Sequence, residues 1–288
     1  MKNLLRGVFA VFVLGCCLII LAGFAGQLHP LGDSLSLLRI PTGLLCLASL
    51  AFPMQRIVRA GVAVVAFFAL LTTAPLFWGT QSDGNLTLYT KNLLYRNSEL
   101  SSLADDIRAS GAEVVTLQEV GRANEAFLTM IEPDYPFQHL CRFIGGSGVA
   151  VLAKTPFVGT PKCSDHRGVA AAQIQKDGNL VWVTSVHLPW PYPYAHEKSA
   201  EAAVALFDEL EGPVVIAGDF NIFPWASSAR RIRAASGTMV AGPVRPTYNL
   251  YGAPLFLDHV YAPNGGNVSY RELLGSDHLG VLARLDLG

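Results

Sequence analysis

Polar side chains stand where apolar, strand-like segments of this sequence end or begin. Asp219 and Asn221 directly follow the apolar run at 214–217, which is typical of a short strand buried on both faces. The arrangement recurs in six places, and the residues concerned are Asn92, Gln118, Glu119, His187, Asp219, Asn221, Asp258, His259, Ser276, Asp277 and His278. Carboxylate and amide oxygens bind divalent cations, and imidazole and carboxylate groups transfer protons. Because α/β proteins place their chemistry at strand ends, these residues are candidates for one site.

Each of these side chains also has a purely structural explanation. Asn92 could cap the helix that follows it, and Asp219 and Asn221 could form an Asx-turn. His259 is best explained as an ordinary hydrogen-bonded histidine of the core. Six polar strand ends in one domain nevertheless exceed what turns require, so the pattern as a whole favours a site.

Strands and helices alternate along residues 86–288 and must position these side chains. Helices are expected at Ser98–Ser110, around 124–131, at Ala195–Leu210 and around 226–234. Strands are expected at Leu86–Tyr89, Glu113–Leu117, Phe137–Arg142, Gly148–Leu152, Ala170–Gln175, Leu180–Ser185, Val214–Ala217, Leu257–Tyr261, Val268–Leu273 and Gly280–Leu285. Several mid-chain strands follow one another as hairpins, which predicts an α/β domain with mixed sheets.

The first 79 residues are of a different kind, because they hold five basic residues and one acidic residue in an otherwise apolar sequence. Three stretches approach the roughly 20 residues that cross a bilayer, at Gly7–Gly26, Leu35–Pro53 and Ala60–Trp78. Arg39 and Pro41 interrupt the second, where Arg39 could snorkel to the interface and Pro41 could occupy the first helical turn. A cleaved signal peptide is the alternative for the first stretch, but it leaves the other two unexplained. We predict an anchor of three transmembrane helices at 1–79, a linker at 80–85 and one domain at 86–288.

Positive charges set the orientation of this anchor. Lys2 and Arg6 precede the first stretch and Arg56 and Arg59 lie between the second and third, whereas the loop between the first two has no Lys or Arg. The positive-inside rule therefore places the N-terminus in the cytoplasm and the domain outside it. In a bacterium this is a multi-pass protein of the inner membrane with a periplasmic domain. An oxidising compartment would permit Cys141 and Cys163 to pair, but their spacing does not establish a disulfide.

Short motifs of the domain resemble those of a known family. They are TKNLL at 90–94, LQE at 117–119, SVH at 185–187, GDFN at 218–221, LDHV at 257–260 and SDH at 276–278. In this order they resemble the endonuclease/exonuclease/phosphatase superfamily, over about Leu86 to Leu285. The resemblance implies a four-layer α/β/β/α sandwich with two mixed sheets and a site at the edge where both sheets converge. It also implies hydrolysis of a phosphate ester that depends on a divalent metal.

The resemblance further implies a role for each matched residue. Glu119 is expected to be the principal metal ligand beside Asn92, with Asp277 as a further ligand, and such hard oxygen ligands suit Mg²⁺ or Mn²⁺. Asp258 is expected to orient His278, as a carboxylate orients the imidazole of a catalytic triad. Asp219, assisted by Asn221, is expected to position or deprotonate water, and His187 to bind a phosphate oxygen. Either His278 or Asp219 could be the general base.

The sequence departs from the family pattern at two positions. Lys91 stands where a small or aromatic residue is usual, and Leu94 stands where some nucleases have a second acidic ligand, which favours one metal over two. Arg167 is either a phosphate contact or an ordinary surface arginine.

Charge and a loop of aromatic residues bear on the substrate. Residues 80–288 hold 16 basic and 21 acidic residues, whereas a nuclease normally presents a basic surface. The basic cluster at 229–233 could bind one phosphate-rich ligand or form a solvated helix face. The loop at 187–196, with three aromatic residues and three prolines, could contact the apolar part of a substrate or the membrane, or pack on its own domain. A membrane-anchored, Mg²⁺-dependent phosphodiesterase or related phosphohydrolase is thus the leading hypothesis, and a lipid-linked substrate is its more specific form. The alternatives are a nuclease and a non-catalytic module that binds a phosphorylated ligand. The second is disfavoured because each main catalytic motif of the family has its expected residue in this sequence. The sequence does not indicate an oligomeric state.

Overall fold

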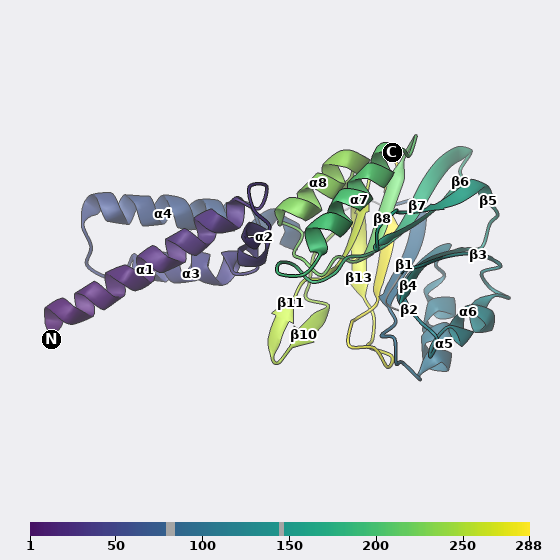
Figure 1. Ribbon diagram of the computed structural model, residues 1–288, viewed down its shortest axis with the longest axis horizontal. Helices are drawn as coiled ribbons and strands as arrows, with labels where there is room; N and C mark the ends of the chain where they lie inside the picture. The colour runs from purple at the N-terminus through teal and green to yellow at the C-terminus, as the bar shows by residue number, and fades with distance from the viewer. Residues whose placement is uncertain (79–83, 144–146) are drawn as a thin grey trace.

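A bundle of helices at one end of the molecule joins an α/β domain at the other (Figure 1). The structure is a computed structural model that describes residues 1–78, 84–143 and 147–288. Residues 80–83 of the predicted linker lie outside the described residues. The N-terminus lies at the end of the bundle that is remote from the domain (Figure 1).

The bundle contains α1 (Lys2–Phe24), α2 (Leu31–Ser36), α3 (Arg39–Ser49), α4 (Arg56–Leu71) and the 3₁₀ helix η1 (Ala74–Phe77). In the described chain two segments are long and apolar enough to cross a membrane, Leu4–Phe24 and Arg56–Phe77. The predicted second span at Leu35–Pro53 is therefore wrong as a single spanning helix. The chain bends between Ser36 and Arg39, and the 11 residues of α3 extend only about 16 Å, half the thickness of the hydrocarbon core.

Arg39 explains this difference. Its side chain is buried rather than snorkelling, and its guanidinium donates to the carbonyl of Gly23 and lies over the ring of Phe24. A buried guanidinium must find acceptors, and these lie where the bundle meets the domain. Pro41 lies in the first turn of α3, as predicted.

Two mixed six-stranded sheets form the centre of the domain within the described residues. The first runs in the order β13-β14-β1-β2-β4-β3 and the second in the order β5-β6-β7-β8-β12-β9. The strands of the first sheet are β1 (Leu86–Asn92), β2 (Val114–Val120), β3 (Phe137–Arg142), β4 (Gly148–Ala153), β13 (Gly266–Tyr270) and β14 (Val281–Leu285). Those of the second are β5 (Phe157–Cys163), β6 (Val169–Lys176), β7 (Asn179–His187), β8 (Val214–Asp219), β9 (Met239–Val240) and β12 (Asp258–Ala262). Only β1 with β2 and β7 with β8 pair in parallel among these neighbours, so the prediction of mixed sheets is confirmed.

Helices cover the outer face of each sheet (Figure 1). The helices α5 (Leu100–Ser110) and α6 (Ala126–Ile131) pack on the first sheet, and α7 (His196–Asp208) and α8 (Ser227–Ser236) pack on the second. A third apolar cluster, which includes Val151, Val183 and Val215, fills the space between the sheets. A short hairpin, β10 (Tyr248–Leu250) with β11 (Ala253–Leu255), projects beside the second sheet.

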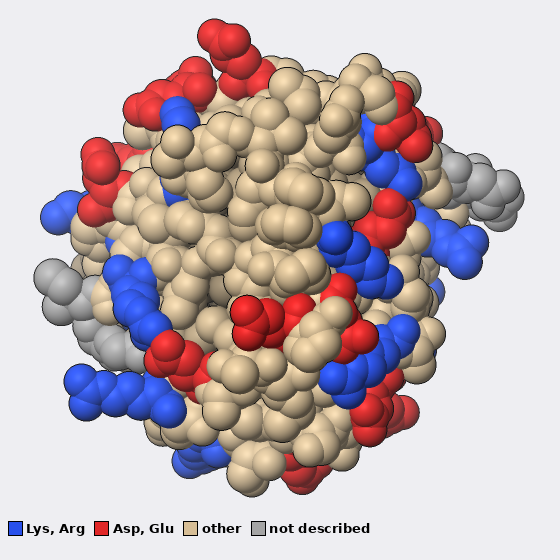
Figure 2. All heavy atoms as spheres, turned by 90° about the vertical axis from the view of Figure 1, so that its right-hand side faces the viewer, with Lys and Arg blue, Asp and Glu red and all other residues tan. Residues whose placement is uncertain are grey.

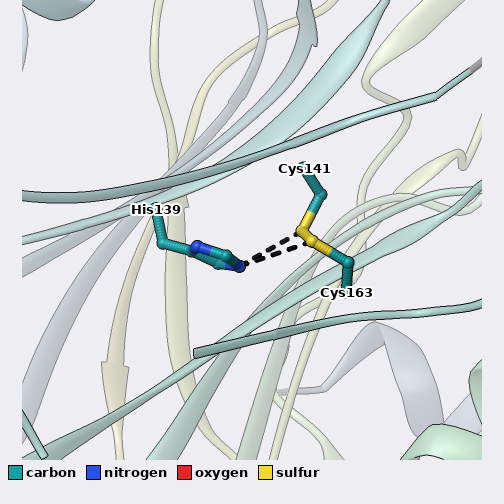
Figure 3. Close-up of side chains that lie close together, drawn as sticks. All are labelled: His139, Cys141 and Cys163. Carbon is teal, nitrogen blue, oxygen red and sulfur yellow. Dashed lines mark hydrogen bonds between the residues drawn. A yellow bond between two sulfur atoms is a disulfide. The ribbon is translucent and has the colours of Figure 1, made fainter. Parts of the chain in front are cut away.

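Cys141 and Cys163 form a disulfide, which answers the question that their spacing left open. It joins β3 to β5, the edge strands of the two sheets. His139 points toward the bridge, with its Nε2 at 3.2 Å from the sulfur of Cys141 and 3.6 Å from that of Cys163 (Figure 3). Because both sulfurs are joined to each other, they are not free thiolates for a metal.

Candidate active site

The register of the strands brings the polar strand ends together. Asp219, the last residue of β8, lies opposite His187 at the end of β7 and opposite Asp258 at the start of β12. In the other sheet Asn92 ends β1 opposite Gln118 of β2, so Glu119 comes next. Parallel strands place their carboxyl ends at one edge of a sheet, and here both sheets do so at the same edge of the domain.

Asp219 links the two sheets through its side chain. Its Oδ2 accepts a hydrogen bond from the side-chain amide of Asn92 at 3.0 Å, across the sheets, and its Oδ1 accepts the backbone N–H of Asn221 at 2.8 Å. The amide of Asn221 also donates to Oδ2 at 3.1 Å and to the carbonyl of Leu188. Burial raises the pKa of Asp219, although His278 opposes that effect. The carboxylate is therefore held in one orientation by three donors.

His278 and Asp258 form a buried pair. The Nδ1 of His278 lies 2.7 Å from the Oδ2 of Asp258, and its Nε2 lies 3.8 Å from the Oδ2 of Asp219. Burial alone would lower the pKa of His278, but Asp258 and Asp219 outweigh burial and raise it. Burial likewise acts to raise the pKa of Asp258, and His278 outweighs it, so that pKa is lowered. Asp258 thus orients the imidazole of His278 and stabilises its protonated form.

His187 presents a donor to the same space. Its Nδ1 lies 3.5 Å from Arg167, and because a guanidinium can only donate, Nδ1 is the acceptor there. Burial, followed by Arg167 and His278, lowers the pKa of His187 to about 3, so the ring is neutral and its proton lies on Nε2. That Nε2 lies 3.8 Å from Glu119 and 3.7 Å from Asp219.

Glu119 is the partly exposed carboxylate of the site. Its Oε2 accepts the backbone N–H of Tyr95 at 3.0 Å, and its Oε1 lies 3.4 Å from the amide of Asn92. The side-chain Oδ1 of Asn92 accepts the backbone N–H of Leu94. Asp277 is exposed and lines the same hollow as Glu119.

The hollow has a volume of about 240 Å³. Its lining includes three carboxylates, which we call the acidic wall (Glu119, Asp219 and Asp277), and five apolar or aromatic residues, which we call the apolar wall (Leu188, Pro189, Trp190, Tyr194 and Tyr248). Arg167, Asn221 and the two histidines, His187 and His278, complete the lining. Three carboxylates and the amide of Asn221 around one space supply hard oxygen donors, which fit Mg²⁺ or Mn²⁺. A second hollow of about 670 Å³ adjoins it through Glu119 and Arg167.

All eight predicted site residues therefore converge. Six line the hollow, and the other two, Asn92 and Asp258, are hydrogen-bonded to Asp219 and His278 respectively. Arg167 lies in the hollow, although its sequence context did not decide between a surface position and a phosphate contact. His259 donates from Nε2 to the carbonyl of Ile222 and is buried, as expected for a core histidine.

Two residues that shape the site, Tyr248 and Lys91, received no structural role from the sequence, although Lys91 is a departure from the family pattern. Tyr248 packs on the ring of His278 with centroids 4.8 Å apart, and it lies in a three-residue strand that has no readable pattern. Lys91 is fully buried, and its ammonium donates to the carbonyls of Glu272, Leu273 and His278 at 3.0, 2.7 and 2.6 Å. It thus holds the loop that carries Asp277 and His278. The signal available in the sequence was a lysine within the TKNLL motif, directly before Asn92.

Comparison with known proteins identifies the family of the domain. The model of the Endonuclease/Exonuclease/phosphatase family matches residues 89–278, which is more than half of the chain. The chain belongs to this family, and its class is that of the metal-dependent phosphoric ester hydrolases. A search of curated proteins found no sequence match to the chain.

Solved structures share the fold at low sequence identity. An endonuclease/exonuclease/phosphatase family protein from Leptotrichia buccalis superposes with a TM-score of 0.57 and 16% identity, over 70% of this chain and 99% of that one. TDP2 of D. rerio in complex with a single-strand DNA product gives 0.56 and 16%, over 69% and 97%. Beta toxin from Staphylococcus aureus, a mutant with bound magnesium ions, gives 0.52 and 18%, over 70% and 100%.

Proposed function

We propose that the protein is a membrane-anchored phosphodiesterase that hydrolyses a lipid-linked phosphate ester at the hollow between its two sheets. The observation that carries this proposal is the convergence of eight polar residues from both sheets, including the Asp258–His278 pair at 2.7 Å. Catalytic groups of a phosphohydrolase must neutralise charge, activate water and orient it, and each task has a candidate here.

A divalent cation fits the acidic wall. Glu119, whose side chain is partly exposed in the hollow, is the proposed principal ligand, with Asn92 beside it and Asp277 as a further ligand. Mg²⁺ or Mn²⁺ bound there would neutralise the charge of the phosphate and polarise its ester bond.

The protein's own groups carry out the remaining steps. Asp219 is oriented by three donors and has only acceptor oxygens when ionised, so we assign it the proton of the attacking water. His278, which Asp258 favours in the protonated form, faces the same space and would stabilise charge on the phosphate. His187 through its Nε2–H and Arg167 through its guanidinium would hold phosphate oxygens.

The apolar wall supports a substrate with an apolar part. Trp190 of that wall belongs to a cluster that also contains Leu37, Ile40, Leu76 and Phe77 of the bundle, so the wall is continuous with the junction to the bundle. The face of the domain remote from the bundle carries Lys and Arg interspersed with Asp and Glu and no continuous basic surface (Figure 2). A lipid-linked phosphate presented from the bilayer surface matches this arrangement better than a long polyanion does.

The bundle supports membrane anchoring and the predicted orientation. Its outward face exposes large apolar side chains such as Val11, Phe12, Phe67 and Phe68, which in water would be an extensive apolar patch. Arg6 and Phe9 of α1 lie beside Pro53 and Val58, so the basic residues at both sites gather at the end of the bundle remote from the domain. By the positive-inside rule that end is cytoplasmic and the domain is extracytoplasmic, which the disulfide also fits.

The test uses the full chain in lipid nanodiscs, stripped of metal and resupplied with Mg²⁺ or Mn²⁺. Turnover is measured on bis(p-nitrophenyl) phosphate, p-nitrophenyl phosphate, single-stranded DNA and phospholipids of the disc. We expect metal-dependent hydrolysis that falls at least 100-fold in Asp219→Asn and His278→Asn. Asp208→Asn, at an exposed carboxylate at the end of α7, is the matched control.

The panel of substrates distinguishes the proposed hydrolase activity from the proposed substrate class. Preferred turnover of DNA would replace the lipid-linked substrate with a nucleic acid and retain the hydrolase. Absence of metal-dependent turnover on every ester, with the protein folded, would refute the hydrolase and favour a binding module. Orientation is tested separately by fusing after Gly288 a reporter that is active only outside the cytoplasm, and an inactive reporter would overturn it.

A further inference from the structure

The bundle and the active site share a buried junction. The short helix α2 lies against the N-terminus of α8, the helix that follows the catalytic loop at 219–226 (Figure 1). Contacts there join residues almost 200 positions apart in the chain, and they involve polar groups that are inaccessible to water.

Asp33 of the bundle caps a helix of the domain. Its Oδ1 accepts the backbone N–H of Ser227 at 2.7 Å and its Oδ2 accepts that of Ser228 at 2.9 Å, and the carboxylate is buried. These are the first two residues of α8, and the residue before them, Ala226, has no side chain that could cap them. The helix that follows the catalytic loop therefore takes its cap from the bundle.

Two further contacts hold the loop itself. The indole Nε1 of Trp225 donates to the carbonyl of Ser36 at 2.8 Å, and Arg39 donates to the carbonyl of Trp225 at 3.4 Å. Phe223 and Trp225 pack in the same cluster as Leu37 of the bundle. Both ends of the segment between Asn221 and α8 are thus tied, one to Asp219 and the other to the bundle.

Asn221 needs such support because its backbone is strained. Its φ of 49° lies in the left-handed region, which a residue other than glycine adopts only when its surroundings enforce it. In this conformation its N–H and its amide reach Asp219. The aromatic loop is tied to the same junction, because Ser34 donates to the carbonyl of Tyr192 at 2.9 Å and His196 contacts Ser228.

We propose that residues 33–39 of the bundle are a positioning element of the active site, with Asp33 as its principal residue. They fix the loop at 219–226 and thereby the orientation of Asp219. The bundle then does more than tether the domain, since the catalytic unit is complete only when the bundle is docked. The kinetic consequence rests on the proposed function, whereas the structural consequence does not.

The experiment compares the wild-type full chain with Asp33→Asn in nanodiscs. Asn offers one acceptor oxygen to two N–H groups, so the amides of Ser227 and Ser228 are expected to exchange hydrogen at least tenfold faster, with β8 unchanged. We expect kcat to fall at least tenfold with KM within twofold, because the loop shift misplaces Asp219 and leaves the hollow intact. Tenfold corresponds to about 1.4 kcal/mol in the barrier.

A second variant and a control make the result specific. A Cβ on Gly26 would lie 2.2 Å from the Oδ1 of Asp33, so Gly26→Ala is expected to reproduce both effects without changing charge. Arg245→Met removes a bond to the carbonyl of Phe77 at the same junction but no hydrogen bond to the catalytic loop, and is expected to change neither.

Each outcome decides the proposal. Unchanged exchange at 220–228, exchange that accelerates throughout β8, or an equal kcat loss in Arg245→Met would overturn it and leave the junction a simple attachment. If the wild type turns over no ester, the proposed function fails, and the exchange comparison alone decides whether Asp33 positions the loop.

Discussion

Replacement of Lys91 by Met removes the ammonium group and keeps an apolar side chain of similar length, so it tests the charge apart from the packing. The side chain is buried in β1, and three backbone carbonyls of the loop at 272–278 accept its hydrogen bonds. Burial lowers the pKa of Lys91 to about 8 against the opposing effect of Asp258, so the group is charged at neutral pH. Met has nearly the same length and volume, so packing is preserved and the three bonds are lost.

The size of the effect follows from where the three carbonyls lie. Glu272 and Leu273 are exposed residues, so water can replace the ammonium at their carbonyls, whereas His278 is buried. One hydrogen bond to a charged group contributes about 1.5–3 kcal/mol, and relief of the desolvated charge offsets part of the loss. We expect Lys91→Met to lower the free energy of unfolding of the domain by about 2 kcal/mol. For a domain of this size the melting temperature then falls by about 4–8 °C.

Activity is expected to fall as well, by about tenfold in kcat, because the released loop carries Asp277 and His278. Thermal unfolding followed by near-ultraviolet circular dichroism and turnover of the preferred ester are the measurements. Lys198→Met, at an exposed position of α7, is the matched control. A melting temperature and kcat for Lys91→Met equal to those of Lys198→Met would refute the reasoning and show that the buried charge does not hold the loop.

Three further predictions concern stability. Gly218 has a φ of 150°, and a Cβ there would lie 2.0 Å from the carbonyl oxygen of Val186, so Gly218→Ala is expected to destabilise the domain by about 2–3 kcal/mol in urea titrations. Replacement of both Cys141 and Cys163 by Ser opens a link across 22 positions, and about 3 kcal/mol should be lost in the same titration. Burial lowers the pKa of His259 to about 4, so the unfolded chain takes up this proton first and stability should fall as pH drops from 6.5 to 4. Its share is at most about 1.4 kcal/mol per pH unit, and His259→Gln should flatten the measured slope by that amount.

Most of the fold around the site could be predicted from sequence, because parallel and central strands carry continuous apolar runs. Residues 214–217 and 113–117 are of this kind, and both lie in central strands with the polar site residues at their ends. The edge strand β5 (Phe157–Cys163) was missed, since it is half-exposed and contains Gly159 and Pro161. The hairpin that carries Tyr248 was missed because strands of three residues are too short to show alternation.

The junction of the bundle could not be predicted, for a different physical reason. In a hydropathy pattern, charged residues such as Arg39 and Asp33 are interpreted only as interruptions of a transmembrane helix. Their partners, Trp225 and the N–H groups of Ser227 and Ser228, lie almost 200 positions away. No local periodicity encodes such a contact, so the second span was predicted too long.

Backbone strain shows that the two halves of the site are supported in different ways. Leu94, Glu119 and Leu274 on the side of the first sheet all have positive φ values, between 48° and 59°. Two buried asparagines of the domain donate side-chain hydrogen bonds to the backbone carbonyls of these strained residues. Asn124 donates to Leu94 and Glu119, and Asn97 donates to Leu274. Strain on the side of the proposed metal ligands is therefore held from within the domain.

Asn221 is the strained residue on the side of the second sheet, and its bonds to Asp219 and Leu188 within the domain are only part of its support. The segment that follows it is tied to Asp33, Ser36 and Arg39 of the bundle. Because strain persists only where surrounding contacts enforce it, loss of the junction should release Asn221 and Asp219 and leave Glu119 in place. The bundle variants are thus expected to retain metal affinity and to lose turnover, whereas disruption of Asn124 should weaken the metal site first. A loss of metal affinity in Asp33→Asn equal to its loss of kcat would contradict this division.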